Sequence, residues 1–204
     1  MMDHPLRVLG VSGSLRQQSK TALALRLFLD FVVQQEGATQ GAEARLLDLR
    51  SVELPMYRPD RETPSDAQRD ITADVEWADA FVLATPDYHG SMSGAMKNFL
   101  DYHWEELAGK VFGYICSSHE KGLTVMDQMR TVVRQCYGWS MPYGVAFDGR
   151  ADFGAGTTLQ NPRVEQRLKM MARDLVVYGR LIRGQFIEDL AGAEANTFAA
   201  TYRG

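Results

Sequence analysis

The chain has 204 residues, of which 45% are hydrophobic and 24% are charged, a composition typical of a globular protein with a sizeable core. The formal net charge is −4, so the chain lacks the basic excess of a nucleic-acid-binding protein. No stretch approaches the ~18 consecutive apolar residues of a membrane span, and residues 1–9 lack the apolar segment of a secretory signal. We therefore expect a cytoplasmic protein that binds neither nucleic acid nor membrane, with Cys116 and Cys136 as buried, reduced thiols.

Strand and helix patterns alternate through the first half of the chain. Short apolar runs typical of buried parallel strands occupy residues 6–11, 44–49 and 80–85. A helix is predicted over residues 19–36, with Gly37 as its stop, and a second helix begins at Ser65 and ends near Trp77. Residues 50–64 contain three prolines and are predicted to form a loop.

The first predicted helix is apolar around most of its circumference. Its hydrophobic residues are Leu23, Leu25, Leu27, Phe28, Leu29, Phe31 and Val32. A helix that is apolar on nearly every side has to be covered on more than one face. We expect it to pack against the sheet and against a second partner, either another helix or a second subunit.

The alternation continues in the second half. Strands are predicted over residues 111–116 and 141–147, and helices over residues 93–104, 124–137 and 162–182. Pro162 lies near the first turn of the last helix, where proline is tolerated. The predicted domain therefore covers residues 1–183, and residues 184–204 form a tail that packs on the domain or on a partner subunit.

Five strands that alternate with helices predict an α/β fold. Right-handed crossovers between such strands build a doubly wound, five-stranded parallel sheet with helices on both faces. In these sheets the ligand lies at the carboxyl ends of the strands, near the point where the strand order reverses. Three polar segments follow predicted strands: residues 12–21, 86–94 and 117–118. We expect all three to meet at one crevice.

The segment from Ser12 to Thr21 has the composition of a phosphate-binding loop. A phosphate at a helix start is held by free backbone N–H groups and the helix dipole, and hydroxyl and guanidinium groups add hydrogen bonds. Gly13 allows close approach of the backbone, and the polar donors are Ser14, Arg16, Ser19 and Thr21. The alternative is a serine-rich turn that binds nothing. Neither G-x-G-x-x-G nor G-K-[ST] is present, so the loop does not match a dinucleotide or nucleoside triphosphate motif. A ligand with a single phosphate fits it better, which favours FMN over FAD.

A second segment completes a recognisable pair. Gly13-Ser14-Leu15-Arg16-x-x-Ser19, together with Thr85-Pro86-Asp87-Tyr88-His89-Gly90-Ser91-Met92-Ser93-Gly94-x-x-Lys97-Asn98-x-x-Asp101, resembles the NADPH-dependent FMN reductase family. The resemblance runs from about Arg7 to Phe147. It implies a flavodoxin-like fold, bound FMN, and a homodimer or homotetramer.

The resemblance also implies cofactor-binding positions. Those that match the family's phosphate-binding residues are Ser14, Arg16, Ser19 and Thr21. Those that match the segment along the isoalloxazine edge are Pro86, Asp87, Tyr88, His89 and Gly90. Ser117 and Ser118 match the loop at the pyrimidine end, although many members have a glycine-rich run there. The tract over residues 148–161 has no clear counterpart in the family.

The implied activity is the transfer of a hydride from NADPH or NADH to bound FMN, and from there to a small-molecule acceptor such as a flavin, quinone, azo compound or metal ion. FMN carries this chemistry, so no catalytic side chain and no metal site are expected. Tyr88 and His89 are candidate pocket residues, although His89 could instead point to solvent. Two alternatives stay open: a flavodoxin-like electron carrier without reductase activity, and a regulatory domain without FMN.

Overall fold

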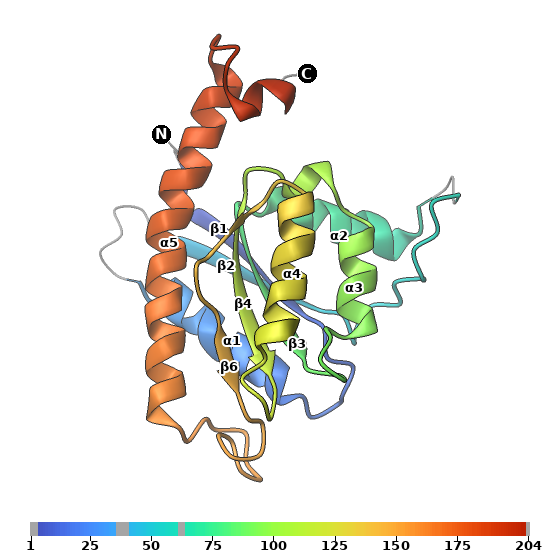
Figure 1. The fold of residues 1–204 in the computed structure, drawn as a ribbon, viewed down its shortest axis with the longest axis vertical. Helices are drawn as coiled ribbons and strands as arrows, with labels where there is room; N and C mark the ends of the chain where they lie inside the picture. Colours follow the sequence, from blue (N-terminus) through green and yellow to red (C-terminus); the bar gives the residue numbers. More distant parts are fainter. Residues whose placement is uncertain (1–3, 36–40, 61–63, 203–204) are drawn as a thin grey trace.

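The computed structural model describes residues 4–35, 41–60 and 64–202, and it contains the predicted parallel sheet (Figure 1). The strands are β1 Leu6–Ser12, β2 Ala42–Asp48, β3 Ala80–Pro86, β4 Val111–Ser117, β5 Trp139–Ser140 and β6 Val145–Phe147. The order is β2-β1-β3-β4-β5, with β6 also paired to β4, and every pairing is parallel. After β2 the chain crosses to the other side of β1 to form β3, so the order changes direction between β1 and β3. This is the pattern of a flavodoxin-like sheet.

The last predicted strand differs from the observed one. Residues 141–147 were expected to be continuous, whereas the edge of the sheet consists of β5 and β6 with a break between them. Pro142 lies in this break and has no N–H to donate to a ladder. Gly144 also lies there, and a Cβ on it would be 2.9 Å from the carbonyl oxygen of Tyr114. Close approach to β4 and the missing donor together interrupt the strand.

Helices cover both faces of the sheet, as predicted. α1 Lys20–Val33 and α5 Pro162–Ala191 pack on one face, and α2 Asp66–Trp77, α3 Gly94–Asp101 and α4 Leu123–Gln135 pack on the other. Two short 3₁₀ helices, η1 Glu105–Leu107 and η2 Phe198–Tyr202, complete the structure. α1 ends at Val33 rather than at residue 36, and α3 ends at Asp101 rather than at residue 104. The predicted stop, Gly37, is outside the described residues.

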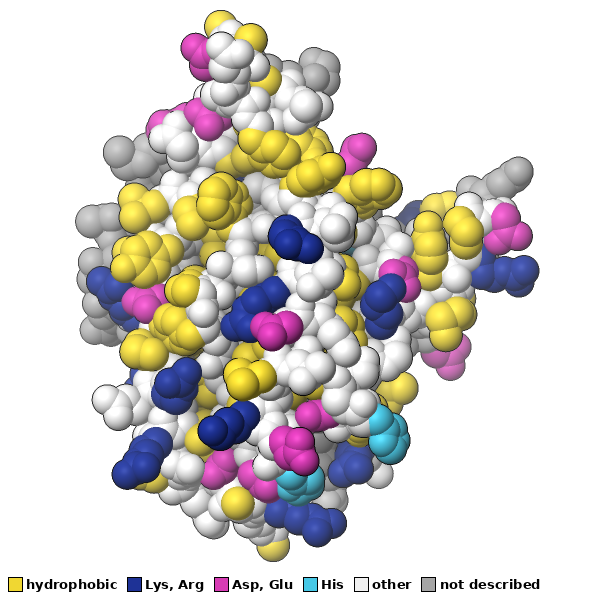
Figure 2. Space-filling view, viewed as in Figure 1, with side chains coloured by type: hydrophobic (Ala, Val, Ile, Leu, Met, Phe, Trp, Pro, Cys, Tyr) yellow, Lys and Arg dark blue, Asp and Glu magenta, His cyan; other side chains and the backbone are white. Residues whose placement is uncertain are grey.

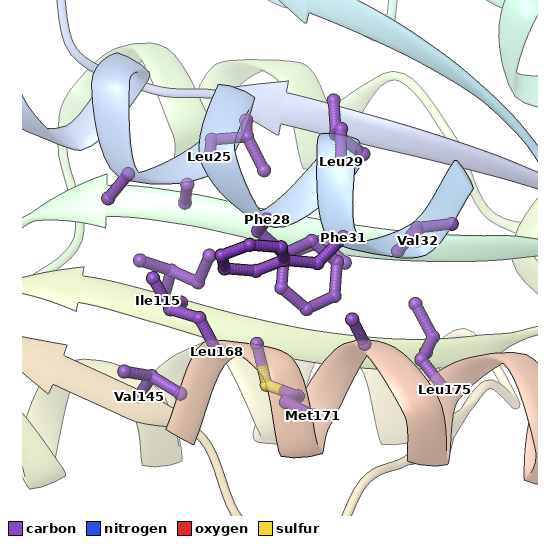
Figure 3. Packing of buried hydrophobic residues seen from close by; sticks show 14 of the residues in the cluster. Leu25, Phe28, Leu29, Phe31, Val32, Ile115, Val145, Leu168, Met171 and Leu175 are labelled. Atoms are coloured by element: carbon purple, nitrogen blue, oxygen red, sulfur yellow. The ribbon is translucent and has the colours of Figure 1, made fainter. Parts of the chain in front are cut away.

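The second partner of α1 is α5 of the same chain. Figure 3 shows Phe28 and Phe31 of α1 on the side of that helix that faces the α5 residues Leu168 and Met171. All four side chains belong to one buried cluster that also includes Ile115 of β4. The apolar circumference of α1 is therefore covered within the chain, so it does not require a second subunit.

α5 is longer than predicted. It continues to Ala191, past the expected end at Ile182, and its far end extends beyond the sheet in Figure 1. Beyond Gly184, Phe186 is buried in a small cluster with Ala108 and Ala199. A Cβ on Gly109 would lie 2.4 Å from the Phe186 ring, so this packing depends on a glycine there. Among the described residues, no helix is both long and apolar enough to cross a membrane.

Candidate functional site

A cavity of about 600 Å³ opens at the carboxyl ends of β1, β3 and β4. Its volume is in the range of small-molecule and cofactor sites. Every predicted cofactor-binding residue except Ser19 lines it. The residues in question are Ser14, Arg16, Thr21, Pro86, Asp87, Tyr88, His89, Gly90, Ser117 and Ser118. Segments far apart in the sequence thus meet at one site, as the order of the strands requires.

One end of the cavity carries the donors of the loop after β1. Ser14 and Thr21 are buried, whereas Arg16 is exposed at the rim. Ser19 caps α1, and its hydroxyl accepts a hydrogen bond from the Ala22 N–H at 3.1 Å. Ser19 therefore fixes the start of the helix instead of facing the cavity. The first turn of α1 has no acidic residue, so the positive end of its dipole is not neutralised by a carboxylate of that turn.

Ser93 joins this loop to the loop after β3. Its hydroxyl donates to the Gly13 carbonyl at 2.6 Å and accepts from the Met96 N–H at 3.1 Å, which caps α3. Gly13 is required by this contact, because a Cβ there would lie 2.8 Å from Ser93 Oγ and 2.9 Å from Met96 Cβ. The two loops are consequently held as one unit.

The loop after β3 forms a tight turn. The backbones of Tyr88 and Ser91 bond to each other in both directions, at 2.9 and 3.1 Å. His89 and Gly90 between them have φ values of 58° and 75°, which is the conformation of a type I′ turn. Positive φ is uncommon for a residue other than glycine, so the conformation of His89 is unusual. The turn places His89 at the exposed rim of the cavity.

Gln128 of α4 holds this turn from the side. Its Oε1 accepts from the Ser91 hydroxyl at 2.8 Å and from the Met92 N–H at 3.3 Å. Its Nε2 donates to the Gly90 carbonyl at 3.2 Å. Gln128 was not predicted as a site residue, because a glutamine on an amphipathic helix is common and its contacts depend on how α4 packs.

Asp87 connects the turn to the loop after β4. Its carboxylate accepts from the Gly90 N–H at 2.8 Å and from the Ser118 hydroxyl at 2.7 Å. In the same loop, Nδ1 of His119 lies 2.5 Å from an Asp148 carboxylate oxygen. Bonds from the backbone N–H of Ala151, from His119 and from the backbone N–H of Arg150 lower the pKa of Asp148 to about 2.

The tract over residues 148–161 forms a further wall of the cavity, which the sequence did not predict. Phe153 anchors it, since its ring is buried and packs 5.4 Å from the Phe147 ring. Lys20 of α1 donates to the Gly156 carbonyl and so ties the tract to the first loop. Arg150 lines the cavity and adds a cation to those of Arg16 and Lys20.

Comparisons with solved structures identify the fold class of the chain. An oxidoreductase from Corynebacterium diphtheriae superposes with a TM-score of 0.74 at 19% identity, over 86% of this chain and 97% of that one. The flavoenzyme NAD(P)H:(acceptor) oxidoreductase FerB from Paracoccus denitrificans gives a TM-score of 0.71 at 19% identity, over 87% and 98% of the two chains. At this identity the likeness establishes the flavodoxin-like fold.

Sequence comparisons identify the family. An NADPH azoreductase of Bacillus sp. (strain OY1-2) is 29% identical over 153 residues, which are 71% of this chain and 78% of the relative. An NAD(P)H-dependent FAD/FMN reductase of Geobacillus thermodenitrificans is 27% identical over 84% of this chain and 92% of its own length. The family model described as NADPH-dependent FMN reductase matches residues 6–152, which include the three loops of the cavity. The chain therefore belongs to the NADPH-dependent FMN reductase family and is an FMN-dependent oxidoreductase that takes its electrons from NAD(P)H.

Proposed function

We propose that the cavity holds FMN, with the phosphate at the start of α1 and the isoalloxazine ring along residues 86–90 and 117–118. The phosphate end would be formed by Ser14, Arg16 and Thr21, with the free N–H groups of the helix start. These groups fit a phosphate dianion because they supply hydroxyl, guanidinium and backbone donors around a helix dipole that no first-turn carboxylate opposes.

The ring end fits a flat heterocycle bound by backbone and hydroxyl groups. The turn at His89 and Gly90 is fixed by Asp87 and Gln128, so its position does not depend on the ligand. Bound FMN supplies the hydride chemistry, and the protein positions the ring and its substrates. Tyr88, which is 40% exposed, and His89 stand at the rim, where they would border the face used alternately by donor and acceptor.

The observation that carries this proposal is the convergence of three separate loops, each after a parallel strand, on one cavity. We propose that the acceptor is a small molecule that meets the open ring face: a flavin, a quinone, an azo compound or a metal ion. The names of the relatives support the flavin and azo classes. The alternative, an electron carrier without reductase activity, is not favoured, because the family model and the relatives are reductases.

The test is FMN retention in Arg16→Ala. Loss of a charge-assisted hydrogen bond should weaken FMN binding by ~1.5–3 kcal/mol, measured by flavin fluorescence titration. Arg26→Ala is the matched control, since Arg26 is an exposed arginine of α1 that does not line the cavity. Equal FMN affinity in both variants would remove Arg16 from the phosphate site.

A homodimer or homotetramer is also part of the proposal. Because α1 is covered inside the chain, it no longer supports an oligomer. The support is the exposed apolar surface near α3, where Trp104 is 62% exposed and Met56 is 72% exposed. The loop that bears Met56 is held on α3, because the Asn98 side chain bonds to the Pro55 carbonyl at 2.8 Å and the Tyr57 N–H at 2.7 Å. A monomeric mass at micromolar concentration with full activity would contradict it. A cytoplasmic location remains a proposal, supported by the two free, buried cysteines.

A further inference from the structure

A second cavity, of about 650 Å³, lies directly beside the first. The two cavities share Ser118, His119 and Leu123 as lining residues, so the loop after β4 is the wall between them. The second cavity extends from this wall over β6 into the space between α4 and α5. A ligand that crosses the shared wall can therefore occupy both cavities at once.

Three cationic side chains line the second cavity: Lys121, Arg130 of α4 and Arg167 of α5. Nη1 of Arg130 lies 2.8 Å from an Asp127 carboxylate oxygen, and Nη2 of Arg167 donates to the Gly144 carbonyl at 3.1 Å. A guanidinium carries five N–H donors, so these contacts orient each group and use only part of its capacity. Figure 2 shows Lys and Arg side chains on the face that carries α4 and α5.

The cavity also has two carboxylates, which the chain itself uses. Asp148 accepts from the N–H groups of Arg150 and Ala151 and pairs with His119. Asp152 accepts from the Asp148 N–H at 2.8 Å and from the Asn161 amide at 2.7 Å. Both carboxylates thus accept hydrogen bonds from the chain itself, whereas the two guanidinium groups keep N–H donors for an anion.

The cavity is also lined by apolar side chains. Its lining includes Met126, Pro142, Tyr143 and Val164. The Tyr143 ring is fixed, since its hydroxyl donates to the Asp174 carboxylate at 2.6 Å and the Arg167 guanidinium lies 6.0 Å from the ring centroid. An aromatic ring and apolar side chains in a cavity that guanidinium groups also line suit an aromatic base that carries a phosphate.

We propose that the second cavity binds the adenosine half of NADPH and that Arg130 and Arg167 contact its 2′-phosphate. The proposal rests on the proposed function, because the nicotinamide end would reach FMN in the first cavity across the shared wall. Arginine forms paired hydrogen bonds to phosphate oxygens, so the two guanidinium groups would favour NADPH over NADH, which has no 2′-phosphate.

The test compares Arg167→Met and Arg130→Met with Arg163→Met. Arg163 is an exposed arginine one turn earlier on α5 and does not line the cavity, so it is the matched control. In FMN-loaded protein, loss of either cavity arginine should raise the KM for NADPH roughly 10- to 100-fold, the effect of a lost charge-assisted hydrogen bond. The KM for NADH, the kcat and the FMN content should match those of the control.

Calorimetry with adenosine 2′,5′-bisphosphate and with adenosine 5′-monophosphate provides a readout independent of turnover. The bisphosphate should bind the FMN-loaded wild-type protein at least ~10-fold more tightly, and either cavity variant should abolish this preference. Equal binding of the two nucleotides, or equal losses with NADPH and NADH, would overturn the 2′-phosphate assignment. Failure of the proposed function is distinguishable from this, because it would appear as unchanged FMN affinity in Arg16→Ala.

Discussion

The two ends of the sheet use charge in opposite ways. At the carboxyl end Arg16, Lys20 and Arg150 stand around a cavity. At the amino end, Asp79 and Lys110 are buried. The Asp79 carboxylate accepts the Arg7 N–H at 3.1 Å, and the Lys110 ammonium donates to the Val75 carbonyl at 2.7 Å, near the end of α2. The first arrangement leaves donors for a ligand, whereas the second uses them to close the fold.

The largest pKa shifts occur at residues that do not line the first cavity. Burial lowers the pKa of His103 to about 4 and that of Lys110 to about 7, and burial raises the pKa of Cys116 to about 12. None of these three residues lines either cavity. Perturbed pKa values often mark functional sites, but here they mark burial. In this protein, convergence of loops with available donors is a better guide to the candidate site than shifted pKa values are.

The largest predicted effect is at the amino end and depends on pH. His103 is buried, and neither ring nitrogen has a hydrogen-bond partner. Its neighbours Glu106 and Lys110 act in opposite directions, and desolvation dominates. The pKa of His103 is about 4 in the folded protein and 6.5 in the unfolded chain. Between these two pH values the histidine is protonated mainly in the unfolded chain, so protonation favours unfolding. This residue therefore destabilises the fold progressively as pH falls through that window, by about 3 kcal/mol in full.

Chemical denaturation of the wild type and of His103→Phe at several pH values between 8 and 4 measures this effect. Phenylalanine keeps a ring beside Phe99, whose centroid is 5.0 Å from that of His103, and cannot take up a proton. The variant should lose less stability than the wild type as pH falls. Parallel pH profiles for the two proteins would refute the role of His103.

The next effect is at the junction of the two loops of the carboxyl end. Gly13→Ala would place a methyl group 2.8 Å from Ser93 Oγ, and overpacking of this kind typically costs ~1–3 kcal/mol. The variant should lower both Tm and FMN affinity, because Ser93 holds both loops. Gly94→Ala is the control, since a Cβ there meets nothing within 4 Å. Normal FMN affinity in a destabilised Gly13→Ala would show that the junction does not position the phosphate loop.

A smaller effect is expected for Gln128→Ala. The substitution removes three hydrogen bonds to the turn at residues 90–92, and the affected backbone can bond to water instead, so the net loss in FMN affinity should be ~1 kcal/mol. Gln135→Ala, at the exposed end of the same helix, should bind FMN as the wild type does. Identical Kd values for both variants would mean that the turn is fixed without Gln128.

The smallest effect is expected at His89. Alanine at a positive φ would strain the turn, whereas asparagine tolerates this conformation, so His89→Asn removes the imidazole and keeps the backbone. If His89 borders the substrate face, His89→Asn should change the KM for the acceptor several-fold, which is less than ~1 kcal/mol, and leave FMN affinity unchanged. Wild-type constants for several acceptors and both nicotinamides would instead place His89 in solvent.

The sequence predicted those parts of the fold that depend on local pattern. Four strands follow from apolar runs, and the helices predicted to begin at Ser19, Ser65 and Ser93 do begin there, each with that serine as its N-cap. The errors arose where tertiary packing overrides local preference. The last helix was predicted to end at Ile182, yet α5 continues because Phe186 beyond it is buried in a cluster with Ala108.

The candidate site divides in the same way. Residues adjacent to strand ends could be placed at the cavity, because parallel strands bring their carboxyl ends together. Arg150 and Gln128 could not, since the first depends on how the tract over residues 148–161 folds back and the second on the rotation of α4. The second partner of α1 was undecided for the same reason, and the structure identifies it as α5.

The binding of FMN with its phosphate at the start of α1 is tested most directly by two parallel titrations of the FMN-free protein, one with FMN and one with riboflavin. Flavin fluorescence monitors both. Riboflavin has the same ring and lacks the phosphate, so it separates the two ends of the cavity. If the start of α1 with Ser14, Arg16 and Thr21 holds the phosphate, one FMN should bind per chain and riboflavin should bind at least ~100-fold more weakly, since several charge-assisted hydrogen bonds are lost. Equal affinity for the two flavins, or no binding of either, would contradict the assignment of the phosphate to the start of α1.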